Sequence, residues 1–174
     1  MVRQVSDLIA VGVNSIELSI LVFGPQVADL SANARTRDLQ NKRIQIKAEL
    51  EAAGHNVKYA EELVDLSLTG PAANPLFQEV LIMQEYDLIV NIVDSPGSIV
   101  EATVVALKPS LARKTALFLD ASYVDGLVGQ ACLNAQDIGA HYQTYAYPDD
   151  LVHCNLLGYV FEQIKRRQKE IFLS

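Results

Sequence analysis

Apolar residues along the chain alternate between short runs with strand-like spacing and longer segments with helical spacing. The strand-like runs are rich in β-branched and large apolar residues and end near Gly, Pro, Asn or Asp. They predict five strands, over residues 15–23, 56–60, 86–93, 114–120 and 141–147. The helical spacings predict helices over residues 38–53, 75–85, about 98–107, part of 121–140, and 149–172.

Strands that alternate with helices favour an α/β fold with right-handed crossovers. We therefore predict a flavodoxin/Rossmann-like three-layer sandwich, with a five-stranded, mostly parallel sheet and helices on both faces. The 174 residues, about half of them apolar, are enough for one domain with a real core. The predicted domain covers residues 1–174, of which 1–14 form an N-terminal extension.

Charge and cysteine content narrow the range of partners. Fourteen Lys and Arg against twenty-one Asp and Glu give a net charge of −7, which argues against broad nucleic-acid binding or an anionic membrane surface. Cys132 and Cys154 are too far apart for a CxxC motif and fit a reducing compartment. No apolar run approaches the length that spans a bilayer, and the first residues do not resemble a signal peptide. We expect a cytoplasmic protein.

The third predicted strand ends at the stretch Asp94-Ser95-Pro96-Gly97-Ser98. Pro96 removes a backbone donor, Gly97 permits close approach to the backbone, and Ser98 is a candidate cap for the next helix. The first amides of that helix would form an anion site, suited to a phosphate, to which Ser95 and Ser98 add hydroxyl donors.

Glu101 follows Ser98 by three residues and has two interpretations. The spacing is that of a capping box, in which the Glu101 side chain reaches back to the Ser98 amide. Glu101 is also the single charged residue between Asp94 and Lys108. A carboxylate beside a phosphate and sugar site can attack or stabilise an anomeric carbon, as in glycosidases. The second interpretation is N-glycosidic bond chemistry.

The run "DLIVNIVDSPGSIVEA" (87–102), with "ILVFGP" (20–25) and "AAGHNV" (52–57) upstream, resembles the nucleoside 2-deoxyribosyltransferase-like superfamily. Within it, the sequence is most similar to nucleotide N-glycosidases such as CMP/hydroxymethyl-CMP hydrolases and to effector domains of bacterial retron defence systems. TIR domains, which cleave NAD, are more distantly similar. The resemblance covers roughly residues 16–120. The chain departs from the family pattern in "EATVVAL", which lacks the usual Gly after the Glu.

This resemblance implies roles for particular residues. Glu101 would be the catalytic carboxylate, and Asp87 or Asp94 could orient it or the sugar. The remaining positions would contact substrate: Gly24 and Pro25 the nucleoside, and Ser95, Gly97 and Ser98 the phosphate or ribose. The family also implies a homodimer or higher homo-oligomer.

Three further residues are candidates for substrate binding. Arg35 and Arg37 follow the Gly24-Pro25 turn and precede the predicted helix, so they could bring a cation to a phosphate or base, although a solvated loop is the simpler explanation. Asp120 ends the fourth strand and could bind a ribose hydroxyl, or only start the next turn.

The sequence predicts neither a metal site nor a cofactor. The three histidines are widely spaced, and there is no P-loop, GxSxG or GxGxxG motif. The leading hypothesis is an N-glycosidase or deoxyribosyltransferase-like hydrolase that acts on a nucleotide or NAD. The alternatives are a non-catalytic nucleotide sensor or interaction module, and an antiviral defence effector that a protein partner holds inactive.

Overall fold

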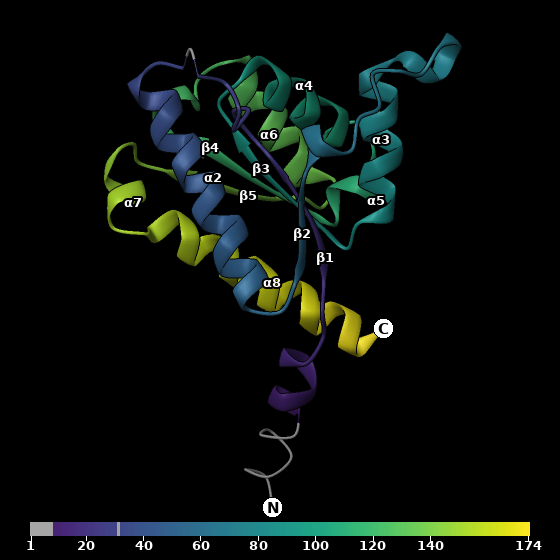
Figure 1. The fold of residues 1–174 in the computed structure, drawn as a ribbon. Coiled ribbons are helices and arrows are strands. Elements are labelled where there is room, and N and C mark those ends of the chain that lie inside the picture. The colour runs from purple at the N-terminus through teal and green to yellow at the C-terminus, as the bar shows by residue number, and fades with distance from the viewer. Residues whose placement is uncertain (1–8, 31) are drawn as a thin grey trace, which may run out of the picture.

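The computed structural model describes residues 9–30 and 32–174. Its centre is a parallel sheet of five strands in the order β2-β1-β3-β4-β5 (Figure 1). The strands are β1 (Ser19–Phe23), β2 (Asn56–Tyr59), β3 (Leu88–Val93), β4 (Thr115–Asp120) and β5 (His141–Tyr145). The predicted parallel sheet is confirmed, and the strand order is that of flavodoxin-like folds.

Helices connect consecutive strands, and two more helices follow the last strand. They are α2 (Ala34–Ala52), α3 (Pro75–Glu85), α4 (Pro96–Val105), α5 (Pro109–Ala112), α6 (Leu127–Asp137), α7 (Asp149–Val152) and α8 (Asn155–Leu173). Residues 9–14 are also helical, and three short 3₁₀ helices occur at η1 (Ala60–Glu62), η2 (Gly70–Ala73) and η3 (Ala121–Tyr123). No helix within 9–30 and 32–174 has both the length and the apolar character to cross a membrane.

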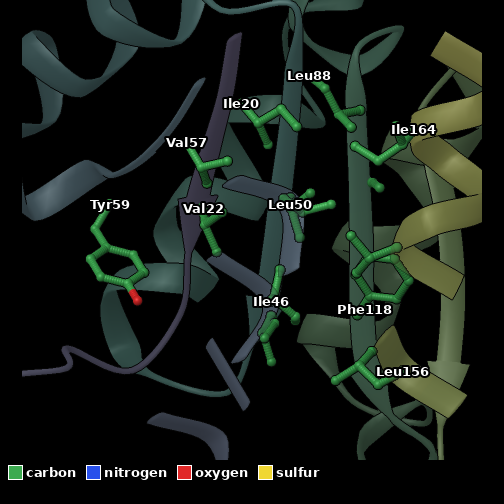
Figure 2. Close-up of a cluster of buried hydrophobic side chains, with 14 of the residues drawn as sticks. Ile20, Val22, Ile46, Leu50, Val57, Tyr59, Leu88, Phe118, Leu156 and Ile164 are labelled. Atoms are coloured by element: carbon green, nitrogen blue, oxygen red, sulfur yellow. The ribbon is translucent and has the colours of Figure 1, made fainter. Parts of the chain in front are cut away.

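The two faces of the sheet are covered by different helices, which gives the predicted three layers. One face packs against α2 and α8, where strand residues such as Val22 and Phe118 meet Ile46 of α2 and Leu156 of α8 (Figure 2). The opposite face packs against α3, α4, α5 and α6. Since both faces are buried, β3 and β4 read as continuous apolar runs rather than alternating ones.

Several helix boundaries differ from the prediction, most clearly those of α2 and of the C-terminal helix. Helix α2 begins at Ala34, four residues earlier than predicted, because the Asn33 side chain accepts a hydrogen bond from the Thr36 amide (2.9 Å) and caps the helix. Arg35 and Arg37 therefore lie in the first turns of α2 rather than before it. The predicted C-terminal helix is divided into α7 and α8, because Cys154 between them adopts a left-handed conformation (φ 59°).

The strand order determines where a site can form. Strands β1 and β3 are neighbours in the centre of the sheet, with Phe23 paired to Asn91. The loops that follow these two strands therefore meet at the same carboxyl edge. Ligands of doubly wound sheets bind at this edge, where neighbouring strands lead to helices on opposite faces.

Candidate active site

A cavity of about 530 Å³ lies at the carboxyl edge between the loops that follow β1 and β3. Its walls come from the β1 loop (Gly24, Pro25), the start of α4 (Ser95, Gly97) and Glu101. The remaining walls are formed by η1, by α3 and by the first turn of α2. The predicted nucleoside-contact and phosphate-contact segments are thus brought together around one space.

The start of α4 differs from the predicted capping box. Ser95, not Ser98, is the N-cap, and its Oγ accepts a hydrogen bond from the Ser98 amide (3.2 Å). The Ser98 Oγ accepts from the Asp94 and Ser95 amides (3.0 and 2.9 Å) and donates to the Ser95 carbonyl (2.9 Å). Ser98 therefore belongs to the cap and is 1% exposed, so its hydroxyl is not free to bind a ligand. Of the first-turn amides, that of Gly97 remains for a ligand, because Pro96 has none.

Glu101 lies one turn further into α4 than a capping role requires. Its side chain is 7% exposed and lines the cavity, and its Oε2 is buried without a hydrogen-bond partner among the described residues. Leaving a buried carboxylate oxygen unpaired costs free energy, and such groups call for an explanation. The capping interpretation of Glu101 is wrong, since nothing in the helix start uses its carboxylate. A ligand in the cavity is a natural partner for it.

The carboxyl groups of the cavity influence one another. Burial raises the pKa of Glu101 to about 8, the nearby Glu79 adds to the rise, Arg43 opposes it, and Glu61 adds further. Burial also raises the pKa of Glu79, again with a contribution from Glu61. Asp29 and Asp94 also line the cavity, whereas no Lys, Arg or His among the described residues does so. Perturbed carboxyl groups in a cleft are typical of functional sites.

Arg43 holds in place two segments of the cavity wall, the Gly24-Pro25 turn and Glu61. The side chain is completely buried on α2 and donates to the backbone carbonyls of Val22, Gly24 and Pro25 (2.6, 3.3 and 2.8 Å). It also forms a two-pronged ion pair with Glu61 (2.7 and 2.8 Å). Gly24 has a φ of +147°, and a Cβ at this position would lie 3.0 Å from Arg43 Cδ. The Gly24-Pro25 turn is therefore shaped to receive Arg43.

Replacement of Arg43 by methionine is expected to destabilise the fold by about 3–5 kcal/mol, because three buried carbonyls and Glu61 lose their donor. Urea unfolding followed by circular dichroism measures the change. Arg166→Met is the matched control, because Arg166 forms an exposed ion pair with Glu170 and its loss is expected to cost less than about 0.5 kcal/mol. Equal stability of the two variants would contradict a supporting role for Arg43.

The predicted cations and Asp120 lie beside the cavity rather than on its wall. Arg35 is paired with Asp94 and Asp120 through bonds of 2.6 to 2.9 Å, and of these three residues Asp94 alone lines the cavity. The ion pair with Arg35 and hydrogen bonds from Ser122 lower the pKa of Asp120 against the effect of its burial. Arg37 donates to the Ala32 carbonyl (2.9 Å) and does not line the cavity. The Arg35 guanidinium is thus engaged by two carboxylates, and neither arginine lies on the cavity wall.

Asp87 does not belong to the site. It precedes β3, and its carboxylate accepts hydrogen bonds from the amide and hydroxyl of Ser19 (2.8 and 2.7 Å) at the start of β1. The six residues of β3 separate it from the carboxyl edge by about 20 Å. The prediction that Asp87 could orient Glu101 or the sugar is wrong for this reason.

Several residues of the site were not predicted from the sequence, among them Glu61, Glu79 and Arg43. Glu61 follows the second strand directly, so its position at the carboxyl edge was a usable signal. Glu79 and Arg43 lie within helices, and no local pattern distinguishes them from solvated residues. Across residues 9–30 and 32–174, no three His, Cys, Asp or Glu side chains are grouped as a metal ion would require.

Comparisons with known proteins do not assign the chain to a family. No protein-family model matches it, and no curated protein does so either. The resemblance to the nucleoside 2-deoxyribosyltransferase-like superfamily stays a prediction.

Proposed function

We propose that the chain is an N-glycosidase, which cleaves the bond between a base and a sugar with Glu101 as the catalytic carboxylate. The observation that carries this proposal is the buried and unpartnered Glu101 Oε2 on the wall of a cavity at the carboxyl edge of the sheet. The cavity lies within the size range of small-molecule sites, which is about 300–1,000 Å³. The position of Glu101 in the "SPGSIVE" segment agrees with the family resemblance.

The chemistry proposed for Glu101 takes place at the anomeric carbon of the sugar. The carboxylate attacks this carbon, or stabilises its positive charge, while the bond to the base nitrogen breaks and its electron pair leaves with the base. The base takes up a proton from solvent unless it departs from a cationic form, as the nicotinamide of NAD does. Water then attacks the same carbon and gives up a proton to solvent, which releases the sugar and restores Glu101.

The charge of the cavity favours a particular part of the substrate. Carboxyl groups line it and no cationic side chain in residues 9–30 and 32–174 does, so a phosphate next to Glu101 would be repelled. A neutral or cationic base–sugar unit suits this environment. Any phosphate of a nucleotide or of NAD would lie at the Gly97 amide and extend from there toward solvent. This revises the prediction that a phosphate is held inside the site.

A substrate panel tests the proposal. The protein is incubated with nucleosides, their 5′-phosphates and NAD, and the release of free base is followed by chromatography. We expect base release from at least one substrate, with nucleosides or NAD favoured over nucleoside monophosphates. Binding without any base release, measured by calorimetry on the same panel, would instead favour a nucleotide sensor and would overturn the proposed activity.

The pH dependence of base release is a further prediction. Glu101 must be ionised to attack, and its pKa of about 8 leaves roughly a tenth of the carboxyl ionised at pH 7. We expect kcat/KM to rise about tenfold per pH unit below pH 7 and to level off above pH 8 to 9. Glu79→Gln removes a negative neighbour and should lower the pKa of Glu101, so the rise in kcat/KM should shift to lower pH. A flat profile between pH 6 and 9 would contradict the role of Glu101.

A further inference from the structure

Arg35 connects four parts of the carboxyl edge. It lies in the first turn of α2, and its Nε and Nη2 both donate to Asp94 Oδ1 after β3 (2.9 and 2.7 Å). Its Nη1 donates to Asp120 Oδ2 at the end of β4 (2.6 Å). The guanidinium carbon lies 4.5 Å from the ring centroid of Tyr147 and 5.2 Å from that of Tyr123. Arg35 is thus restrained in its plane by carboxylates and on its faces by aromatic rings.

The partners of Arg35 are themselves fixed. Tyr147, which follows β5, donates its hydroxyl to Asp38 one turn along α2 (2.8 Å). Asp120 also accepts a hydrogen bond from the Ser122 amide (2.9 Å). The Asp94 and Asp120 side chains are 10% and 6% exposed. The hydrogen bonds from Arg35 to the two aspartates are short, and both carboxylates are largely buried. Arg35, rather than solvent, therefore fixes the position of the Asp94 side chain.

Asp94 is the member of this cluster that reaches the cavity. Both bonds from Arg35 end on its Oδ1, and the described residues supply no hydrogen bond to its Oδ2. Asp94, which lines the same wall as Ser95 and Gly97, therefore has one oxygen held by Arg35 and one to which the described residues give no hydrogen bond. A carboxylate oxygen of this kind accepts a hydrogen bond from a hydroxyl group.

We infer that Arg35 is a positioning residue, which fixes Asp94 so that its Oδ2 accepts a hydroxyl of the substrate's sugar. The inference rests on the proposed base–sugar substrate and adds the origin of sugar selectivity. It replaces the prediction that Arg35 contacts substrate directly. In this arrangement Arg35 determines which sugars are accepted, without touching them.

The test compares sugars that differ by one hydroxyl. Adenosine, cytidine, guanosine and uridine are each compared with their 2′-deoxy and 3′-deoxy forms. The wild-type protein is expected to favour one hydroxylated form by about 10- to 100-fold in kcat/KM, the worth of a hydrogen bond to a charged group. Arg35→Gln should remove most of this preference and slow the matching deoxy substrate much less. Arg37→Gln, altered two residues along the same helix, should keep the full preference.

The outcomes separate a positioning role from a structural one. An equal loss by Arg35→Gln on hydroxylated and deoxy substrates would overturn the inference, because general damage to the fold does not depend on one substrate hydroxyl. Thermal unfolding checks that each variant is folded. If Arg35→Gln does not fold, Arg35→Lys is tested in its place. Lysine keeps the positive charge but cannot bind Asp94 and Asp120 with a forked guanidinium group, so it should lose part of the preference for the hydroxylated substrate.

Failure of the proposed function can be told apart from failure of this inference. The same nucleosides are titrated calorimetrically into Glu101→Gln, alone and combined with Arg35→Gln. If the wild-type protein releases no base but binding shows a hydroxyl preference that disappears with Arg35, the proposed activity fails and the positioning role stands. If the wild-type protein releases base but neither turnover nor binding depends on a sugar hydroxyl, the activity stands and the positioning role is overturned.

Discussion

Replacement of Glu101 by glutamine is expected to lower base release by at least about 1000-fold. Glutamine has nearly the same shape, so the cavity and its other walls stay in place. It cannot form a glycosyl ester or carry the negative charge that stabilises a cationic sugar. The measurement is kcat/KM on the best substrate of the panel, at a pH above 8 where the wild-type carboxyl is mostly ionised.

The matched control is Glu85→Gln. Glu85 ends α3, is exposed and does not line the cavity, so its neutralisation should change the rate less than twofold. A Glu101→Gln variant that is folded and retains wild-type activity would show that the carboxylate is not catalytic. Base release equally reduced by both variants would point to the overall charge of the protein instead.

The sequence predicted the layers of this fold well because the two buried faces leave a strong pattern. The apolar runs at β1, β3 and β4 are continuous, and α8 has a clear apolar face toward the sheet. The boundaries were less predictable because single side chains decide them. Asn33 begins α2 early, and Ser95 begins α4 before Ser98.

The site was predicted where local sequence and sheet position coincide. Gly24, Ser95, Gly97 and Glu101 follow strands that a parallel sheet brings to one edge, so order along the chain was enough to group them. Asp87 was misplaced because a residue before a strand lies at the opposite edge.

The contribution of the helices to the site could not be predicted in the same way. Glu79 lines the cavity, and Arg43 holds the Gly24-Pro25 turn beside it, through the rotation of α3 and α2 about their axes. That rotation is set by packing against the sheet rather than by any motif in the local sequence. The buried environment that raises the pKa of Glu101 depends on these tertiary contacts. The sequence therefore singles out Glu101 as a candidate but does not predict the ionisation of its carboxyl group.

The same change at Glu101 is expected to stabilise the fold, and by an amount that grows with pH. The folded-state pKa of about 8 lies above the ordinary value of 4.5, so the protonated, buried carboxyl favours folding fully below pH 4.5. As pH rises from 4.5 through 8, the unfolded chain ionises first and this contribution is lost. Glutamine does not ionise, so the Glu101→Gln variant keeps this contribution at every pH.

The expected gain in unfolding free energy from Glu101→Gln is about 1 kcal/mol at pH 5.5 and about 4–5 kcal/mol at pH 8.5, at 1.36 kcal/mol per unit of pKa difference. For a domain of this size, the larger figure corresponds to roughly 10 °C or more in Tm. Thermal unfolding at both pH values measures it, with Glu85→Gln expected to show no pH-dependent gain. A Glu101→Gln variant no more stable than wild type at pH 8.5 would mean that the protein already compensates the Glu101 charge. An increase in stability together with a loss of activity would instead identify Glu101 as a residue kept, at a cost to folding, for its chemistry.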